Sequence, residues 1–310
     1  MSNLQDRLAL AMVERGYSMA VTSIQHLDQL RENIQGLREK GLLDGAFFQN
    51  RLSWFDFRIP ENLPNCSSLI ILAVPRAQSQ ATFSYEGEKR TLIIPPTYTA
   101  YDATTKKVQA LLGQILANEG YNLAETSLPL KTLAAWSGLC EYGKNNVCYV
   151  SGMGSFLQLV AVYSNMPCSN DRWQEAKVME SCQSCQLCSQ ACPTGAIPSD
   201  RFLLRAERCI VYHNEKEGSV PFPDWMKRSW HNCLVGCLRC QWTCPLNKGL
   251  LQWIDEREEF SEEETELLLE GATRDRLSAE TIRKLEHLDL MDYLGNLPRN
   301  LGVFFGKDVH

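Results

Sequence analysis

Apolar residues in the first third of the chain recur with two different spacings. Leu4, Leu8 and Met12 follow a helical period that stops at Gly16, which predicts an amphipathic helix. The run 67–75 is almost continuously apolar and ends in proline, a pattern typical of a strand buried on both faces. We expect this run to be the central strand of a sheet.

The same patterns predict three further elements before residue 120. Phe83 and Tyr85, then Leu92 and Ile94, alternate with polar residues around a Glu-Gly-Glu turn and predict a hairpin within residues 81–95. Helical spacing predicts two more helices, at about residues 28–40 and 108–116. Helices interleaved with strands indicate a mixed α/β domain.

The second half of the chain has a different texture. Residues 175–250 are loop-rich, and the residues after them are acidic and carry helical signals. Ser261 and Glu264 form a capping box that opens one helix, and a second helix is predicted over residues 278–294. We therefore divide the chain into a domain of residues 1–170, a module of residues 171–250 and a helical tail of residues 251–310.

The composition is that of an ordinary globular protein. The chain has 310 residues and a mass of 35.2 kDa, with 44% hydrophobic and 22% charged residues. Its longest apolar stretches are far shorter than the roughly 18 residues that a membrane span requires, so we expect no membrane association. The net charge of -6 and the pI near 5.5 argue against a generally basic surface for nucleic acid, although they are compatible with a local basic patch.

Eight of the thirteen cysteines lie in one stretch with the spacing of iron–sulfur ligands. They read Cys182-x2-Cys185-x2-Cys188-x3-Cys192-Pro193, then Cys209, then Cys237-x2-Cys240-x3-Cys244-Pro245. This pattern predicts two [4Fe–4S] clusters, because a two-residue spacer lets neighbouring thiolates reach different irons of one cubane. Zinc would be the default for an isolated Cys-x2-Cys pair, but it fits three such cysteines closed by x3-Cys-Pro less well. Disulfides are not expected, because no export signal opens the chain and a cytoplasmic protein meets a reducing environment.

A ligand rule divides these cysteines into two complete sets. In double-cluster proteins the cysteine before each proline normally ligates the other cluster. The first set is then Cys182, Cys185, Cys188 and Cys244, and the second set is Cys192, Cys209, Cys237 and Cys240.

The cysteine module and the segment before it resemble a known family. Residues 182–197, 208–212 and 236–247 are similar to the twin-cluster module of epoxyqueuosine reductases, which the related reductive dehalogenases share. Upstream, residues 137–145 (SGLCEYGKN) and 154–156 (GSF) resemble the segment GLGWxGKN…GS of the reductases. The resemblance implies an α+β architecture: a nitroreductase-like α/β domain that binds cobalamin, then a bacterial-ferredoxin-like double [4Fe–4S] module and a short helical tail.

The resemblance places the cobalamin site in the glycine-rich segment. Glycines there would let the backbone approach a large flat ligand, and Lys144 and Asn145 can donate hydrogen bonds to a corrinoid tail. Glycines in loops are also common as plain turns, and that alternative stays open. The candidate cofactor-binding residues are Gly138, Leu139, Cys140, Gly143, Lys144, Asn145, Gly154 and Ser155.

The proton-donating aspartate of the family has no clear counterpart in this chain. Its expected position falls on Ala124, so the adjacent Glu125 is the substitute that we consider, with a surface carboxylate as the alternative. Tyr98, Tyr101 and Asp102 form a second candidate catalytic group, since a buried tyrosine near cobalt can donate a proton. Packing with one hydrogen bond is the ordinary role of a tyrosine and remains the alternative.

Two differences from the family shape the functional hypothesis. The tRNA-reducing members continue into a basic helical-repeat region, whereas this sequence ends at His310 after an acidic tail, so we do not expect tRNA as a partner. The twin-arginine leader of exported dehalogenases is missing, and we expect a cytoplasmic protein.

We expect a cobalamin-dependent reductase with a small-molecule or protein-bound corrinoid substrate. A ferredoxin or flavodoxin would reduce the clusters, and the clusters would pass electrons to a bound corrinoid that performs the chemistry. One alternative is an electron-transfer protein or reductive activase for the corrinoid of a partner. The other is a nitroreductase-like flavoenzyme with an appended ferredoxin module.

Overall fold

The computed structural model describes residues 3–307 and divides them between two compact units. The segments of the two units alternate along the sequence. Unit 1 comprises residues up to Pro75, Asp102–Gln186 and Ile197–Ala206, and unit 2 comprises Arg76–Tyr101, Leu187–Ala196 and the residues from Glu207 onward. Among residues 3–307, no helix combines the length and the apolar character needed to cross a membrane.

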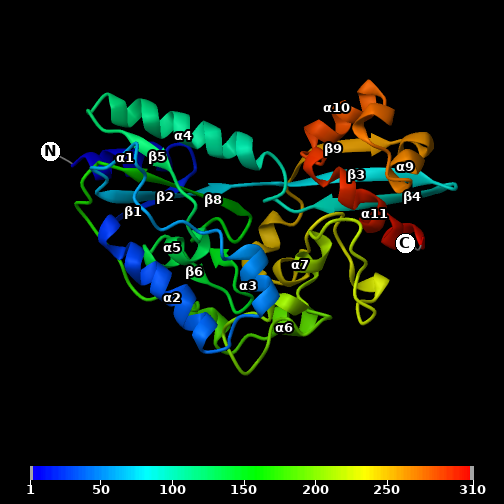
Figure 1. Cartoon of the computed structure of the whole chain (residues 1–310), viewed down its shortest axis with the longest axis horizontal. Helices are drawn as coiled ribbons and strands as arrows, with labels where there is room; N and C mark the ends of the chain where they lie inside the picture. The colour runs from blue at the N-terminus through cyan, green and yellow to red at the C-terminus, as the bar shows by residue number, and fades with distance from the viewer. Residues whose placement is uncertain (1–2, 308–310) are drawn as a thin grey trace. The chain divides into compact units, whose positions relative to one another are not determined.

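Unit 1 is built on a four-stranded sheet in which all neighbouring strands are antiparallel (Figure 1). The order across the sheet is β1 (Ser18–Ser23), β2 (Ser68–Pro75), β8 (Leu157–Ser164) and β5 (Leu123–Glu125). The apolar run predicted as a central strand is β2, one of the two inner strands, and all its residues except Pro75 are buried. Its continuous apolar sequence follows from this position, because both of its faces are covered.

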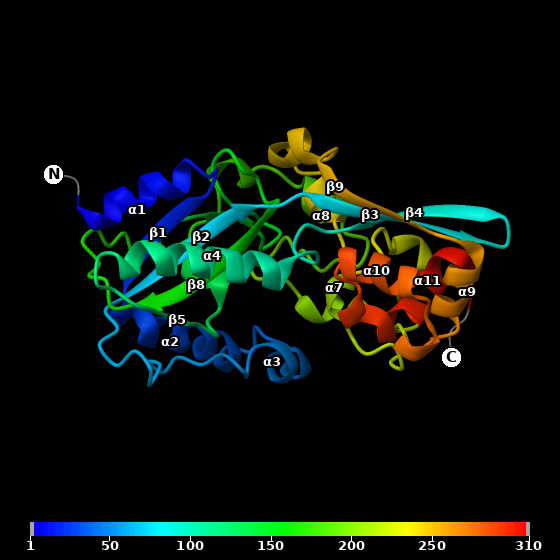
Figure 2. The same ribbon diagram turned by 90° about the horizontal axis from the view of Figure 1, so that it is seen from above.

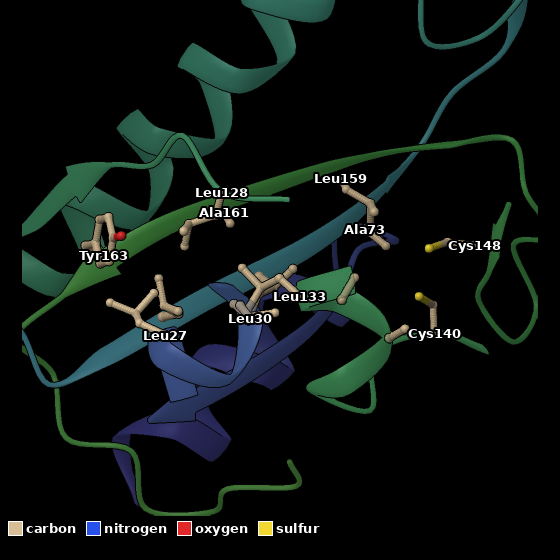
Figure 3. Packing of buried hydrophobic residues seen from close by; sticks show 14 of the residues in the cluster. Leu27, Leu30, Ala73, Leu128, Leu133, Cys140, Cys148, Leu159, Ala161 and Tyr163 are labelled. Atoms are coloured by element: carbon tan, nitrogen blue, oxygen red, sulfur yellow. The ribbon is translucent and has the colours of Figure 1, made fainter. Parts of the chain in front are cut away.

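Successive residues of β2 supply two separate cores. Ile70 and Leu72 pack against α1 (Leu4–Val13) and α4 (Tyr101–Ala117) on one face of the sheet. Leu69 and Ile71 point to the other face and belong to the cluster of α2 (Leu27–Glu39) and α5 (Leu130–Trp136). In Figure 1 the sheet lies between α4 and the pair α2 and α5. Figure 3 shows the second core, with Leu27, Leu30 and Leu133 directed at the strands. The predicted helices are thus present, at Leu4–Val13, Leu27–Glu39 and Tyr101–Ala117.

Two small elements complete unit 1. Helix α3 (Gly45–Arg51) is capped by Asp44, whose side chain accepts from the amide of Phe47 at 2.8 Å. A two-stranded hairpin, β6 (Glu141–Tyr142) and β7 (Cys148–Tyr149), carries the GKN segment in its turn.

Unit 2 contains the predicted hairpin, extended by a strand from the tail. Strands β3 (Gln78–Tyr85) and β4 (Glu88–Ile94) pair antiparallel around Glu86 and Gly87, which both have positive φ angles (50° and 77°) as a type I′ turn requires. Strand β9 (Ile254–Phe260) adds to β3 in parallel. We had predicted a purely helical tail, and this strand corrects that expectation. The pairing partner of β9 lies more than 170 residues earlier in the chain, so the local sequence carries little sign of it.

The remaining tail is helical, as predicted, with different bounds. Helix α9 (Glu262–Leu269) has the predicted capping box, in which the Ser261 amide donates to Glu264 at 2.8 Å and the Glu264 amide donates to the Ser261 hydroxyl at 3.2 Å. Helix α10 (Ala279–His287) ends before the predicted residue 294, because Asp289 takes a left-handed conformation (φ 51°). Helix α11 (Leu297–Phe305) follows and was not predicted. Figure 2 shows α9, α10 and α11 together beside the sheet, where they close the core of unit 2.

The cysteine-rich residues form short elements only. They include α6 (Leu187–Ala191), α7 (Ile210–Asn214) and α8 (Arg239–Trp242), each of one turn or little more. This loop-rich texture agrees with the prediction, since a metal site can replace apolar burial in holding such segments together.

Candidate iron–sulfur centre

All four cysteines of the second predicted ligand set lie in unit 2. Cys192 follows α6, Cys209 is the N-cap of α7, Cys237 precedes α8, and Cys240 lies within α8. Helices α6 and α8 are in contact. Burial raises the pKa of the Cys237 thiol to about 11, and the nearby Cys192 adds to the shift. A thiolate at this position therefore needs positive charge beside it, which the irons of a cluster would supply.

The first predicted ligand set is divided between the units. Cys182 and Cys185 belong to unit 1, and Cys188 and Cys244 belong to unit 2. Within unit 1 the Lys144 ammonium donates to the carbonyl oxygen of Cys185 at 2.8 Å. Lys144 thus fixes the backbone between two candidate ligands.

No group of three or more His, Cys, Asp or Glu side chains within residues 3–307 converges as a site for one metal ion. A cubane does not require such convergence, because its four thiolates bind four different irons. The ligand sets therefore rest on the spacing of the cysteines.

Three residues near the last cysteine run, two of them just before Cys233 and one hydrogen-bonded to Gly236, carry buried polar atoms without a partner among the described residues. The side-chain Nδ2 of Asn214, Nδ1 of His231 and both polar atoms of Asn232 are buried without a hydrogen-bond partner among the described residues. An unsatisfied buried polar group costs about 1–3 kcal/mol, so several together call for an explanation. The Nδ2 groups of Asn214 and Asn232 are donors, and donors fit a cluster because its sulfurs accept hydrogen bonds. His231 is buried, and this burial lowers its pKa to about 4, so its ring is neutral at pH 7.

Gly236 makes a close backbone contact beside Cys237. Its φ is +70°, and its amide donates to the Asn214 side-chain oxygen at 2.7 Å. A Cβ atom here would lie 2.6 Å from the Tyr98 ring. Only glycine satisfies both the left-handed backbone and the packing.

Tyr98, a predicted catalytic residue, lies in this environment. Its hydroxyl donates to the carboxylate of Glu215. Burial raises the pKa of Tyr98 well above its usual value, and the charge of Glu215 adds to the shift. Its ring covers Gly236 next to a candidate ligand, so the structure gives Tyr98 a packing role whether or not it also donates a proton.

The other predicted catalytic residues are on the surface of their units. Glu125 is exposed at the end of the edge strand β5, paired in register with Val162. Tyr101 and Asp102 are exposed in the first turn of α4. Their catalytic roles stay predictions.

The GKN hairpin uses most of its polar groups within unit 1. The Gly143 amide donates to the Val147 carbonyl at 2.9 Å, and the Asn145 amide group donates to the Tyr149 hydroxyl at 3.1 Å. A Cβ at Gly143 would lie 2.5 Å from the Asn145 side-chain oxygen. Local packing in the turn therefore explains why residue 143 is glycine, and no bound ligand is needed to explain it.

Asn146, which the sequence interpretation overlooked, has the clearest structural role in this hairpin. It adopts φ +56°, its side chain donates to the Phe202 carbonyl at 2.9 Å, and its side-chain oxygen accepts from the amide of Leu204. It thereby fixes the segment that follows the first cysteine run. A second asparagine directly after GKN was the available sign.

The remaining predicted cofactor residues surround this hairpin. Gly138 ends α5 with φ +77°, Leu139 packs against the core, and Ser155 is buried beside Gly154, whose carbonyl accepts from Val150 at 3.0 Å. Cys140 is buried, and its sulfur faces that of Cys148 (Figure 3). None of these positions has a hydrogen-bonding side chain directed to open solvent, and their cofactor role stays a prediction.

Comparison with known proteins defines the class. Residues 181–247 match the family described as "4Fe-4S double cluster binding domain". The cysteine module is therefore a double iron–sulfur module, as its spacing predicted.

The chain as a whole is similar to epoxyqueuosine reductases, and this confirms the resemblance inferred from the sequence. It is 29% identical to the epoxyqueuosine reductase of Bacillus subtilis over 197 residues, which is 60% of this chain and 49% of that protein. The chain thus spans about half the length of this relative. The solved structure of epoxyqueuosine reductase from Streptococcus thermophilus matches 97% of this chain and 80% of that chain, with a TM-score of 0.68 and 18% identity. A structure of epoxyqueuosine reductase with an epoxyqueuosine-modified tRNA-Tyr stem loop has the same coverage, with a TM-score of 0.66 and 22% identity.

These comparisons correct the functional expectation. The prediction that tRNA is not a partner is wrong. An epoxyqueuosine reductase with this fold has been solved with a tRNA stem loop. The expectation of a small-molecule or corrinoid substrate is wrong, whereas the expectation of an oxidoreductase is confirmed, because the relatives are epoxyqueuosine reductases. The comparisons give no support to a ferredoxin or flavodoxin partner or to the activase and flavoenzyme alternatives. The expectation rested on the lack of a basic helical-repeat region after the acidic tail, and that argument does not consider the surfaces formed by the rest of the chain. Acidic residues are concentrated in the tail, and basic residues can gather elsewhere.

Proposed function

We propose that this chain is an iron–sulfur reductase that acts on an epoxide-bearing nucleoside in tRNA. The observation that carries the proposal is the double-cluster segment 181–247 within a fold that matches epoxyqueuosine reductases over 97% of the chain. Reduction of an epoxide consumes two electrons and two protons, and two [4Fe–4S] clusters would deliver the electrons one at a time. The cytoplasm, where thiolates stay reduced, is the compartment that we expect.

A surface of unit 2 supports contact with RNA. Arg208, Trp225, Lys227 and Trp230 form what we call the basic–aromatic surface. The Arg208 guanidinium lies 6.0 Å from the Trp225 ring, the Lys227 ammonium lies 5.8 Å from the Trp230 ring, and the two indoles are 6.5 Å apart. Trp225 is 42% exposed. Aromatic rings stack on unpaired bases and neighbouring cations contact phosphates, so this surface fits a single-stranded RNA loop.

The central test is conversion of the modified RNA. The full chain, reconstituted anaerobically and reduced with dithionite, should convert an epoxyqueuosine-containing tRNA-Tyr stem loop, as measured by mass spectrometry of the nucleosides. Cys240→Ser should abolish conversion, whereas Cys66→Ser, which changes a buried cysteine of unit 1 outside the motif, should not. Protein that contains about eight irons and binds the RNA but gives no conversion would refute the proposal.

RNA binding is tested separately by fluorescence anisotropy. Trp225→Ala and Trp230→Ala should each weaken binding by about tenfold, since stacking contributes about 1–3 kcal/mol per base. Lys227→Gln should reduce the slope of the logarithm of the binding constant against the logarithm of the salt concentration by about one. Trp54→Ala, which changes an exposed tryptophan of unit 1, is the control. Equal binding by all four variants would exclude this surface.

Cobalamin binding and a nitroreductase-like origin of unit 1 remain separate proposals, based on the sequence resemblance. The contacts of Lys144 and Asn145 within unit 1 weaken the case for them as corrinoid ligands. Anaerobic titration of the reconstituted protein with cobalamin, followed by absorbance, tests binding. An unchanged spectrum at equimolar cofactor would exclude it.

A further inference from the structure

A buried arginine in the tail contacts the backbone between the cysteine segments. Arg299 in α11 is only 4% exposed. Its guanidinium donates to four carbonyl oxygens, those of Asn214 (2.9 Å), Lys216 (2.9 Å), Glu217 (2.9 Å) and Val220 (2.6 Å). These residues follow α7, so Arg299 holds the loop that leaves this helix.

The neighbouring Asn300 extends the network to the last cysteine run. Asn300 is fully buried, and its amide group donates to the Leu234 carbonyl at 3.1 Å. The Asn214 side chain, at the end of the helix that Cys209 caps, accepts the amide of Gly236 at 2.7 Å. Two residues of α11 therefore hold the backbone after α7 and the backbone before Cys237, which are next to three of the four ligands of the second predicted cluster.

Arg299 brings into this region a positive charge that neutral oxygen atoms solvate but no carboxylate of the described chain neutralises. It forms no ion pair with a carboxylate among residues 3–307, and Phe222 covers its guanidinium at 4.4 Å. Burial lowers its pKa to about 10, which leaves it charged at neutral pH, and its charge contributes to the lowered pKa of His231. Carbonyl oxygens satisfy the guanidinium hydrogen bonds but carry no net charge, so a negative group nearby would stabilise this buried charge further. A cubane with four thiolates is net negative and becomes more negative on reduction.

We propose that Arg299 is the counter-charge and positioning residue of the cluster held by Cys192, Cys209, Cys237 and Cys240. It fixes the ligand-bearing backbone through its hydrogen bonds and raises the reduction potential of this cluster through its charge. The inference rests on the two-cluster part of the proposed function and is independent of the RNA substrate.

The test measures midpoint potentials and iron content of the full chain under anaerobic conditions. Arg299→Met removes the charge, Arg299→Lys keeps it, and Asn300→Leu removes hydrogen bonds at unchanged charge. Arg274→Met is the matched control, because Arg274 lies in the same tail but is exposed and paired with Glu286. Potentials are followed by redox titration with electron paramagnetic resonance detection.

We expect Arg299→Met to lower the midpoint potential of one cluster by about 59 mV. For a one-electron couple, this shift raises the ratio of oxidised to reduced cluster tenfold at a given solution potential. Asn300→Leu and Arg274→Met should keep the wild-type potential in the protein that retains iron. Arg299→Met with full iron content and the wild-type potential would overturn the inference.

A second measurement applies if the methionine variant does not fold. Burial lowers the pKa of a lysine, so the potential of Arg299→Lys should fall as pH rises from 7 to 10, relative to wild type and to Arg274→Met. A difference that stays constant with pH would overturn the charge role. Wild-type protein without iron would overturn the inference and the two-cluster proposal together, whereas the RNA assays test the substrate proposal alone.

Discussion

Substitution of Gly236 by alanine should destabilise the protein in two ways, through a clash with Tyr98 and through the cost of a left-handed backbone at a residue with a side chain. At φ +70° any residue with a Cβ is strained by roughly 1–2 kcal/mol. The new methyl group would also lie 2.6–3.0 Å from three atoms of the Tyr98 ring and hydroxyl, closer than real Cβ contacts allow. Overpacking of this kind costs about 1–3 kcal/mol, so we expect a total destabilisation of about 2–5 kcal/mol.

Gly195 is the matched control for this prediction. It lies in unit 2 just after Cys192, has φ +65°, and a Cβ there would meet nothing within 4 Å. Gly195→Ala should therefore show only the backbone cost of roughly 1–2 kcal/mol. The difference between the two variants isolates the contact with Tyr98.

The assay is anaerobic thermal unfolding together with iron content. Gly236→Ala should melt at least about 2 °C below Gly195→Ala and should retain less iron, because the displaced residue precedes Cys237. Tyr98→Leu in the Gly236→Ala background should recover part of the loss, since it removes the clashing ring atoms. Equal melting temperatures for the two alanine variants, or strict additivity of the Tyr98 and Gly236 changes, would refute the reasoning.

Three further predictions concern other parts of the chain. Cys209→Ser should lower the iron content from about eight per chain towards four, whereas Cys66→Ser should leave it unchanged; equal iron in both would exclude Cys209 as a ligand. Asn146→Ala should destabilise unit 1 by about 1–3 kcal/mol in denaturant unfolding, because it removes the contacts to residues 202 and 204 and strains a positive φ. Asn146→Gly relieves the backbone strain and should lose less stability. A larger loss for the glycine variant would contradict the role of Asn146. Burial acts to raise the pKa of Glu264, but hydrogen bonds from Lys284, the Ser261 amide and a threonine lower it below its usual value. The ionised carboxylate therefore stabilises the fold above about pH 4.5, and this contribution is lost as the pH falls further. Glu264→Gln keeps the capping geometry and should flatten the decline of melting temperature between about pH 5 and 3; an unchanged decline would exclude the linkage.

The elements that could be predicted are those whose cause is local. Strand β2 was predictable because both of its faces are buried and nearly all of its residues are apolar. The turn at Glu86 and Gly87 and the capping box at Ser261 have fixed sequence signatures, since neighbouring residues satisfy each other's hydrogen bonds. The iron–sulfur module was predictable for the same reason, because its ligand spacing reflects the size of one cubane.

The expectation about tRNA was wrong because it rested on a missing basic region after the tail and did not consider which residues of the remaining chain share a surface. Net charge is a sum over the whole chain, whereas binding depends on which charges share one surface. Arg208 and Lys227 are separated by nineteen positions in sequence and flank the same pair of tryptophans in the structure. Their shared location is not visible in the composition.

The sequence by itself determined strand β2, the hairpin of β3 and β4, the capping box at Ser261 and the chemistry of the cysteines, because each depends on residues close together in the chain. Only the tertiary structure decided that β9 pairs with β3, that Tyr98 covers Gly236, and that Arg299 binds the backbone at the end of α7. These contacts join segments that lie about 80 to 180 residues apart, and an arginine or a tyrosine has the same local pattern whether it ends in solvent or in the core. Long-range packing selects between those outcomes, because burial of a polar group is stable only where distant backbone atoms complete its hydrogen bonds.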